Sequence, residues 1–170
     1  MGKKLFFITG GQRSGKSSYA QNLALSLSDR PVYLATSRIW DEEHRRRIEH
    51  HKAGRGADWT NVEEEKELAN HDFSGQVVLV DCVTLWLTNF FFDSGSDVEN
   101  SLKEAKAEFE KLMQQEADFI FVSNEIGLGG MSPNEVQRNF SDLQGWMNQY
   151  IAAQADEVVL MVSGIPVKIK

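Results

Sequence analysis

The sequence predicts an α/β fold in which a mostly parallel sheet is flanked by helices. Short apolar runs rich in β-forming residues alternate with longer, helix-compatible segments along the 170 residues. Parallel strands need such helical crossovers between them. A glycine-rich loop also separates the first apolar run from the first helical segment. The length suits one ordinary domain, so we expect residues 1–170 to form a single domain.

Five apolar runs are predicted strands, at residues 5–9, 32–35, 77–81, 119–123 and 158–162, and residues 167–169 can form a last one. Gly164-Ile165-Pro166 leaves too little chain for a crossover helix, so the last two strands should pair as an antiparallel hairpin at one sheet edge. Helices are predicted at residues 16–27, 41–52, 97–116 and 133–154.

Composition excludes several classes of protein. Apolar residues make up 41% and no apolar run approaches the roughly 20 residues of a membrane span, which predicts a soluble protein. The apolar run after Lys3 and Lys4 is too short for a signal peptide. A net charge of -7 disfavours nucleic acid as a partner. The single cysteine, Cys82, lies in an apolar run, which predicts a buried, inert thiol and a reducing cytoplasm as the compartment.

An aromatic run, Phe90-Phe91-Phe92, precedes a group of turn residues that ends at Asp97. Contiguous aromatics are either part of a core or, when exposed, mark a contact surface. Both interpretations stay open at the level of the sequence.

The glycine-rich loop is a P-loop. It reads Gly10-Gly-Gln-Arg-Ser-Gly-Lys-Ser17, with a predicted strand before it and a predicted helix after it. Its glycines let consecutive N–H groups point at phosphate oxygens, and the helix adds its positive end. Lys16 should reach the β- and γ-phosphates of ATP or GTP, and the Ser17 hydroxyl should bind Mg²⁺.

Two polar positions follow other predicted strands. Asp81 ends the apolar run 77–81, which is the Walker B arrangement that holds Mg²⁺ opposite Ser17; the alternative is that Asp81 caps a turn. Asn124 and Glu125 follow the strand 119–123, at the sheet edge where ligands gather. They either touch substrate or Mg²⁺, or Asn124 caps a helix.

Residues 41–55 carry a histidine pair among Arg, Lys and Glu side chains. Positive neighbours lower the pKa of a histidine, so neutral imidazole is available, and His50 or His51 could attack the α-phosphate of a nucleotide. Composition alone favours a solvated helix face with salt bridges. A metal site is less favoured, because adjacent histidines do not share a helix face.

Several further segments, in this order, resemble one family. They are Tyr33-Leu-Ala-Thr36, Arg47-Ile-Glu-His-His-Lys-Ala-Gly-Arg55, Asp58-Trp59 with Glu63, Asp81-Cys-Val-Thr-Leu-Trp-Leu-Thr-Asn89, Ser123-Asn-Glu-Ile-Gly127, Asp142-Leu-Gln-Gly145, Asn148-Gln149 and Val162-Ser-Gly-Ile-Pro-Val-Lys-Ile-Lys170. With the P-loop, they resemble the bifunctional adenosylcobinamide kinase / adenosylcobinamide-phosphate guanylyltransferase family of cobalamin biosynthesis, nearly end to end. The fold class is accordingly that of a RecA-like P-loop NTPase. Residues 129–133, Gly-Gly-Met-Ser-Pro, depart from the Gly-Ile-Val-Pro of many relatives.

The resemblance implies two reactions. ATP or GTP would phosphorylate the hydroxyl of adenosylcobinamide, and GMP from GTP would then pass through a guanylylated histidine to give adenosylcobinamide-GDP. The histidine maps onto His50, and Lys16 is the other expected catalytic residue. The nucleotide contacts carry over to Gly10, Gly11, Gln12, Arg13, Ser14, Gly15, Lys16, Ser17, Leu34, Ala35, Thr36, His51, Lys52, Ala53, Gly54, Glu63 and Asp81.

From the P-loop and the Walker B arrangement, Mg²⁺ is expected at Ser17 and Asp81, and the resemblance suggests a homotrimer to which residues 86–92 could contribute a contact. Two other functions remain as alternatives. One is a P-loop kinase for another small metabolite, in which His50 is structural. The other is a nucleotide-sensing switch, although no Asn-Lys-x-Asp segment for guanine selection is present.

Overall fold

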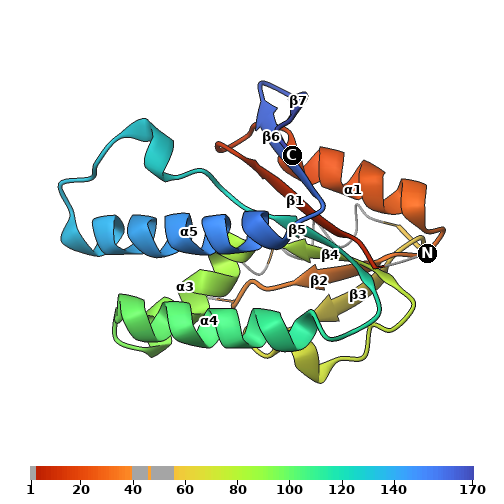
Figure 1. The fold of residues 1–170 in the computed structure, drawn as a ribbon, viewed down its shortest axis with the longest axis horizontal. Coiled ribbons are helices and arrows are strands. Elements are labelled where there is room, and N and C mark those ends of the chain that lie inside the picture. The colour runs from red at the N-terminus through yellow and green to blue at the C-terminus, as the bar shows by residue number, and fades with distance from the viewer. Residues whose placement is uncertain (1–2, 40–45, 47–55) are drawn as a thin grey trace.

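The computed structural model describes residues 3–39, 46 and 56–170. Seven strands form one sheet (Figure 1): β1 (Leu5–Gly10), β2 (Val32–Ala35), β3 (Thr60–Glu63), β4 (Val77–Asp81), β5 (Asp118–Val122), β6 (Glu157–Val162) and β7 (Ile165–Lys168). The helices are α1 (Lys16–Leu27), α3 (Val83–Asp93), α4 (Val98–Leu112) and α5 (Glu135–Gln154), with two 3₁₀ turns, η1 (Leu68–Asn70) and η2 (Gly127–Gly129).

The strand order across the sheet is β3-β2-β4-β5-β1-β6-β7. Every neighbouring pair is parallel except β6 and β7, which form an antiparallel hairpin at one edge. β5 separates β1, which leads into the P-loop, from β4, which ends at Asp81. The predicted fold class is therefore confirmed, including the C-terminal edge hairpin.

The two faces of the sheet bury different side chains, because successive residues of a strand point in opposite directions. Phe7, Leu34 and Phe121 pack with α3, α4 and α5 in the larger core. Ile8 and Ile120 pack with Ala20 and Ala24 of α1 on the other face. Figure 1 shows α4 and α5 side by side, with α1 beyond the sheet. Because β1 to β6 are parallel, their carboxyl ends lie together along one side of the sheet.

The sequence missed two elements. β3 has the sequence Thr-Asn-Val-Glu and is mostly exposed, so it lacks the apolar run by which buried strands are recognised. α3 is the opposite case: its first ten residues, Val83 to Phe92, carry no charge, and it is largely buried, so no polar face shows its helical period.

The core interpretation of the aromatic run is confirmed for two of its three residues, and the contact-surface interpretation stays a prediction. Phe90 and Phe91 are core residues, whereas Phe92 is 54% exposed. Cys82 is buried, as predicted, and burial together with the charge of Asp81 raises the pKa of its thiol to about 12. At the hairpin, Ile165 and Pro166 belong to β7 rather than to the turn, and proline is tolerated there because β7 is an edge strand.

The predicted helix at 41–52 and the predicted site residues His50, His51, Lys52, Ala53 and Gly54 lie outside the described residues. Within the described ranges, no helix is long and apolar enough to cross a bilayer.

Candidate active site

The register of the sheet aligns the ends of four strands. Ile8 of β1 pairs with Val122 of β5, Val122 with Asp81 of β4, Asp81 with Ala35 of β2, and Ala35 with Glu63 of β3. The P-loop begins at Gly10, two residues beyond this row. The sheet therefore places the P-loop, Asp81, the end of β2 and Glu63 along one carboxyl edge, where ligands of parallel sheets bind.

Two glycines of the P-loop are required by its packing. A Cβ atom at Gly10 would lie 2.6 Å from Ser14 Oγ and 2.8 Å from the carbonyl oxygen of Met161. Gly15 has a φ of +92°, and a Cβ atom there would lie 3.1 Å from the Cα atom of Gly164. Gly164, in the β6–β7 turn, also donates its N–H to the carbonyl oxygen of Ser14 over 2.8 Å. The β6–β7 hairpin thus packs directly against the P-loop.

Lys16 is the first residue of α1 and is only 8% exposed. Its ammonium group donates a hydrogen bond to the carbonyl oxygen of Gly11 over 2.8 Å, so it lies over the loop. Burial lowers the pKa of Lys16, and the nearby Cys82 and Asp81 oppose that shift. A buried ammonium gains more from an anionic partner than an exposed one does, because its own hydration is already lost.

Around Lys16, the other predicted loop residues differ in exposure. Gly11, Gln12, Arg13 and Ser17 are exposed. Ser14 Oγ is buried, and among the described residues it has no hydrogen-bond partner. The exposed positions leave the loop backbone and the Ser17 hydroxyl accessible to a phosphate ligand.

Asp81 is half-buried at the end of β4, and its carboxylate accepts a hydrogen bond from the hydroxyl of Tyr33. The Tyr33 ring packs edge-on against Trp59, with 5.7 Å between ring centroids. This hydrogen bond holds the Asp81 side chain at the strand end on the same face as α1. The residue after Asp81, Cys82, is the N-cap position of α3.

At the end of β2, the side chains of the predicted nucleotide contacts are used within the fold. Leu34 belongs to the larger core, and Thr36 is fully buried. The hydroxyl of Thr36 donates to the carbonyl oxygen of Cys82 over 2.8 Å and accepts from its N–H over 3.0 Å. Asn89 donates its side-chain amide to the carbonyl oxygen of Thr36. Ala35 is partly exposed, and Glu63, at the end of β3, is exposed.

Asn124 and Glu125 are held by a buried polar network beneath them. Ser123 Oγ donates to Asn148 Oδ1 over 2.6 Å, and Gln144 Nε2 donates to Ser123 Oγ over 2.7 Å. Asn148 Nδ2 then donates to the carbonyl oxygen of Asn124 over 3.1 Å. The side chain of Asn124 donates to Thr84 Oγ1, and the N-cap residues of η2 and α5 are Ile126 and Asn134. The alternative that Asn124 caps a helix is therefore wrong.

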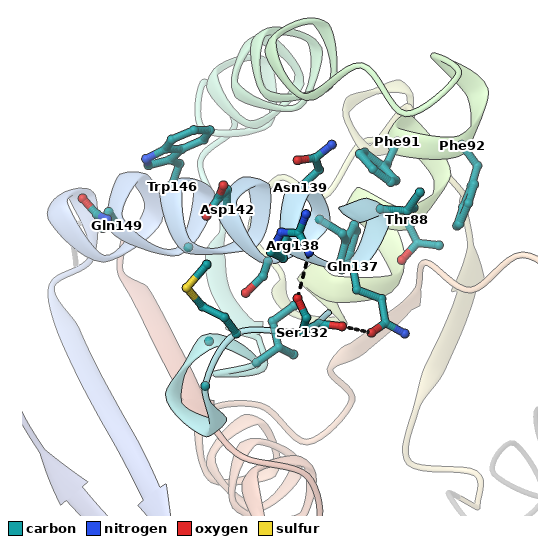
Figure 2. A pocket seen from close by; sticks show the side chains of 18 residues that line it. Thr88, Phe91, Phe92, Ser132, Gln137, Arg138, Asn139, Asp142, Trp146 and Gln149 are labelled. Atoms are coloured by element: carbon teal, nitrogen blue, oxygen red, sulfur yellow. Dashed lines mark hydrogen bonds between the residues drawn. The ribbon is translucent and has the colours of Figure 1, made fainter. Parts of the chain in front are cut away.

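Two cavities are lined in part by the segment 124–132. The first, about 770 Å³, lies against the P-loop and is lined by Gly11, Gln12, Asn124, Glu125, Ile126, Leu128 and Gly129. The second, about 790 Å³, lies along α5, and Figure 2 shows Phe91, Phe92 and Thr88 at one end of it and Trp146 and Gln149 at the other. Ile126 lines both cavities.

Comparison with known proteins identifies the family. The family model of cobinamide kinase / cobinamide phosphate guanyltransferase (CobU) matches residues 6–169. The chain belongs to this family. The cobinamide kinase / cobinamide phosphate guanyltransferase family is thus the one that the sequence segments resembled, and its name describes enzymes with these two activities.

Individual relatives span nearly the whole chain. The bifunctional adenosylcobalamin biosynthesis protein CobU of Escherichia coli (strain K12) is 40% identical over 181 residues, with 98% of this chain and 99% of the relative covered. CobU of Salmonella typhimurium is 38% identical, with 98% and 99% covered. CobP of Pseudomonas aeruginosa is 39% identical, with 96% and 95% covered.

Solved structures with a related shape include an ATPase domain, with a TM-score of 0.47 at 12% identity, covering 93% of this chain and 69% of that one. The flagellar accessory protein FlaH from Methanocaldococcus jannaschii has a TM-score of 0.45 at 14% identity, covering 94% and 71%.

Sequence reasoning assigned no role to four polar residues of this candidate site: Thr9, Tyr33, Gln144 and Asn148. Gln144 and Asn148 stand four residues apart on the buried face of α5, a spacing at which two polar side chains share one helix face. That spacing was a usable signal. The hydrogen bond from Thr9 to Glu125 joins residues 116 positions apart, and that from Tyr33 to Asp81 joins residues 48 positions apart. No local sequence pattern predicts such bonds.

Proposed function

We propose that this chain, acting as one P-loop catalytic domain, phosphorylates adenosylcobinamide with ATP or GTP and then transfers GMP from GTP to the resulting phosphate. The observation that carries the proposal is the buried Lys16 over a P-loop whose backbone is open to ligand. Membership in the cobinamide kinase / cobinamide phosphate guanyltransferase family supplies the acceptor.

For the kinase step, the amides from Gly10 to Ser17 would bind the triphosphate and Lys16 would stabilise the charge on the transferring oxygens. We extend the nucleotide site along the edge to Glu63, Asp81 and the backbone of residues 34–36. The buried side chains of Leu34 and Thr36 restrict those two residues to main-chain contacts.

Mg²⁺ fits the residues at this edge. A nucleotide-bound Mg²⁺ takes most of its ligands from phosphate and water, and needs one or two protein oxygens. The exposed Ser17 hydroxyl and the Asp81 carboxylate, which Tyr33 orients, are oxygen donors of that kind. The ion would neutralise charge on the β- and γ-phosphates.

For the second step, we propose that His50 attacks the α-phosphorus of GTP, forming an N–P bond as the bond to the departing pyrophosphate breaks. The acceptor phosphate then displaces the histidine and receives GMP. His51, Lys52, Ala53 and Gly54 complete the proposed guanine nucleotide contacts. The support for these roles is the Arg-Ile-Glu-His-His-Lys-Ala-Gly-Arg segment within the family match.

Incubation with α-labelled GTP tests the histidine. We expect a protein-bound label that is acid-labile and alkali-stable, absent in His50→Ala and retained in His51→Ala. Wild-type protein that phosphorylates cobinamide without ever taking up the label would instead be a kinase in which His50 is structural.

A further inference from the structure

We propose that Glu125 is the general base of the kinase step and takes the proton of the acceptor hydroxyl in the cavity beside the P-loop. The inference rests on the proposed kinase function. It starts from the position of Glu125, three residues beyond β5 at the carboxyl edge of the sheet.

Glu125 is fixed to the P-loop strand at both its backbone and its side chain. Its N–H donates to the carbonyl oxygen of Gly10 over 3.0 Å. Its Oε1 accepts from the buried Thr9 hydroxyl over 2.7 Å and from Asn148 Nδ2 over 3.5 Å. The carboxylate therefore has a defined place relative to the first glycine of the phosphate loop.

The second carboxylate oxygen is available for chemistry. Both hydrogen bonds to the Glu125 side chain end on Oε1, and Oε2 accepts none from the residues that the structure describes. Glu125 lines the 770 Å³ cavity together with Gly11 and Gln12 of the P-loop. A hydroxyl that enters this cavity would lie near both the P-loop and the Glu125 carboxylate, so one acceptor could reach the base and the phosphate site together.

The step balances. The acceptor O–H gives its proton to Glu125, and the acceptor oxygen forms a bond to the γ-phosphorus. The bond between that phosphorus and the β–γ bridging oxygen breaks, and its electron pair leaves with the nucleoside diphosphate. Asp81 is less suited to this role, because its carboxylate accepts from Tyr33 and lies at the proposed metal position.

Comparing the two proposed reactions distinguishes a general base from a merely structural residue at position 125. The kinase acceptor is an alcohol that must lose a proton. The guanylyl acceptor is a phosphate monoester, which is already ionised at neutral pH because its second pKa is about 6. Glu125→Gln keeps an oxygen to accept from Thr9 but removes the base, so only the first reaction should fail.

The experiment measures both reactions on the full chain, with cobinamide plus ATP and with cobinamide phosphate plus GTP. For Glu125→Gln we expect kcat of the kinase reaction to fall by about 100-fold or more, the KM for ATP to stay within about twofold, and the acidic limb of the pH–rate profile to disappear. GMP transfer to cobinamide phosphate should persist. Glu135→Gln, which alters an exposed carboxylate at the start of α5, is the matched control.

Thr9 provides a second variant, as a positioning residue. Thr9→Val removes the hydrogen bond to Oε1 and should lower kinase kcat and shift the acidic limb, whereas Thr9→Ser should restore both. Kinase turnover within about threefold of wild type in Glu125→Gln overturns the assignment of Glu125, and so does an equal loss of both reactions. If the wild type makes no cobinamide phosphate, the proposed function itself fails.

The cavity along α5 carries a second inference: we infer that it seats the corrin ring of the acceptor. Phe92 and Trp146, each about half exposed, supply apolar surface, and Asn139 and Gln149 supply amides beside it. A corrinoid has apolar ring faces and a rim of carboxamide side chains, which match such a lining. Ile126, the wall shared with the first cavity, is where the hydroxyl arm would pass toward Glu125.

Hydrogen bonds within the chain hold one wall of this cavity in place. Arg138 donates to the carbonyl oxygen of Ser132 over 3.0 Å, and Ser132 Oγ donates to Gln137 Oε1 over 2.5 Å (Figure 2). Arg138 also donates to the carbonyl oxygen of Pro133 over 2.8 Å. These bonds tie the segment after η2 to the first turns of α5. Gly145 lies in the same wall, and a Cβ atom there would meet no atom within 4 Å.

Gly145→Leu tests the seat, because Gly145 lines the cavity and a Cβ atom there meets no other atom within 4 Å, so a larger side chain should take up space that the ring would need. Binding of dicyanocobinamide, measured by equilibrium dialysis, should weaken at least tenfold while ATP binding stays unchanged. Ala153→Leu, an exposed position farther along α5, is the matched control. Trp146→Ala, which truncates a half-exposed side chain, is a second variant and should also weaken binding of the corrinoid.

The oligomeric mass of each variant, measured by light scattering, separates a ligand seat from a contact between subunits. Weakened corrinoid binding at unchanged mass supports the seat. Unchanged corrinoid affinity in both Gly145→Leu and Trp146→Ala overturns it, and so does a weakening that accompanies a change of mass.

Discussion

Replacing Asn148 with alanine should both destabilise the fold and release Glu125. Asn148 is 7% exposed and takes part in four hydrogen bonds, with Ser123, Gln144, Asn124 and Glu125. Three of them measure 2.6 to 3.1 Å. A net worth of about 1 kcal/mol for each of these, plus the cost of buried partners left unpaired, gives a loss of about 3 to 4 kcal/mol in the free energy of unfolding.

The assay is urea unfolding, in which a lower midpoint at constant m reports the loss of stability. For a chain of this size the loss corresponds to a fall of about 6 to 16 °C in Tm. Gln149→Ala, the next residue on α5 and an exposed one, should change stability by less than about 0.5 kcal/mol. Kinase turnover of Asn148→Ala should also fall. A loss below about 1 kcal/mol with normal turnover would refute the reasoning.

Three further predictions concern the surroundings of the site. Gly10→Ala should cost about 1 to 3 kcal/mol and abolish ATP binding, because its Cβ would press on the Met161 carbonyl, whereas Gly75→Ala, in open space, should leave ATP binding intact. Cys82, whose pKa is raised to about 12, should react with thiol reagents at about pH 8 only on unfolding; rapid labelling of native protein would contradict its burial. Arg38 holds the pKa of Asp93 at about 2, below its ordinary value of 3.8. The ion pair should therefore stabilise the fold above pH 3.8, and the free energy of unfolding should fall by under about 1 kcal/mol as the pH drops toward 2. Asp93→Asn should not show this pH-dependent loss.

The elements that the sequence predicted well are those whose local pattern and burial agree. The helix at 16–27 and the strands at 32–35 and 77–81 have the predicted bounds, because the P-loop and uniform apolar runs mark them. β3 and α3 were missed for opposite reasons. One is an exposed edge strand held by its pairing with β2, and the other is a helix buried on nearly all sides.

The candidate site divides in the same way. The P-loop, Lys16 and Asp81 were recognisable because a motif fixes their spacing along the chain. The support of that loop by Gly164, and of Glu125 by Thr9, arises from contacts between distant segments, which only the fold brings together. The role of His50 remains a prediction from the family resemblance.

Mass spectrometry of the products tests the central proposal most directly. Cobinamide, ATP, GTP and Mg²⁺ incubated with the full chain should yield cobinamide phosphate first and cobinamide-GDP second. Lys16→Ala should stop the first product, and His50→Ala should allow the first but not the second. Hydrolysis of ATP or GTP that depends on Lys16 but forms neither product would contradict the proposed function.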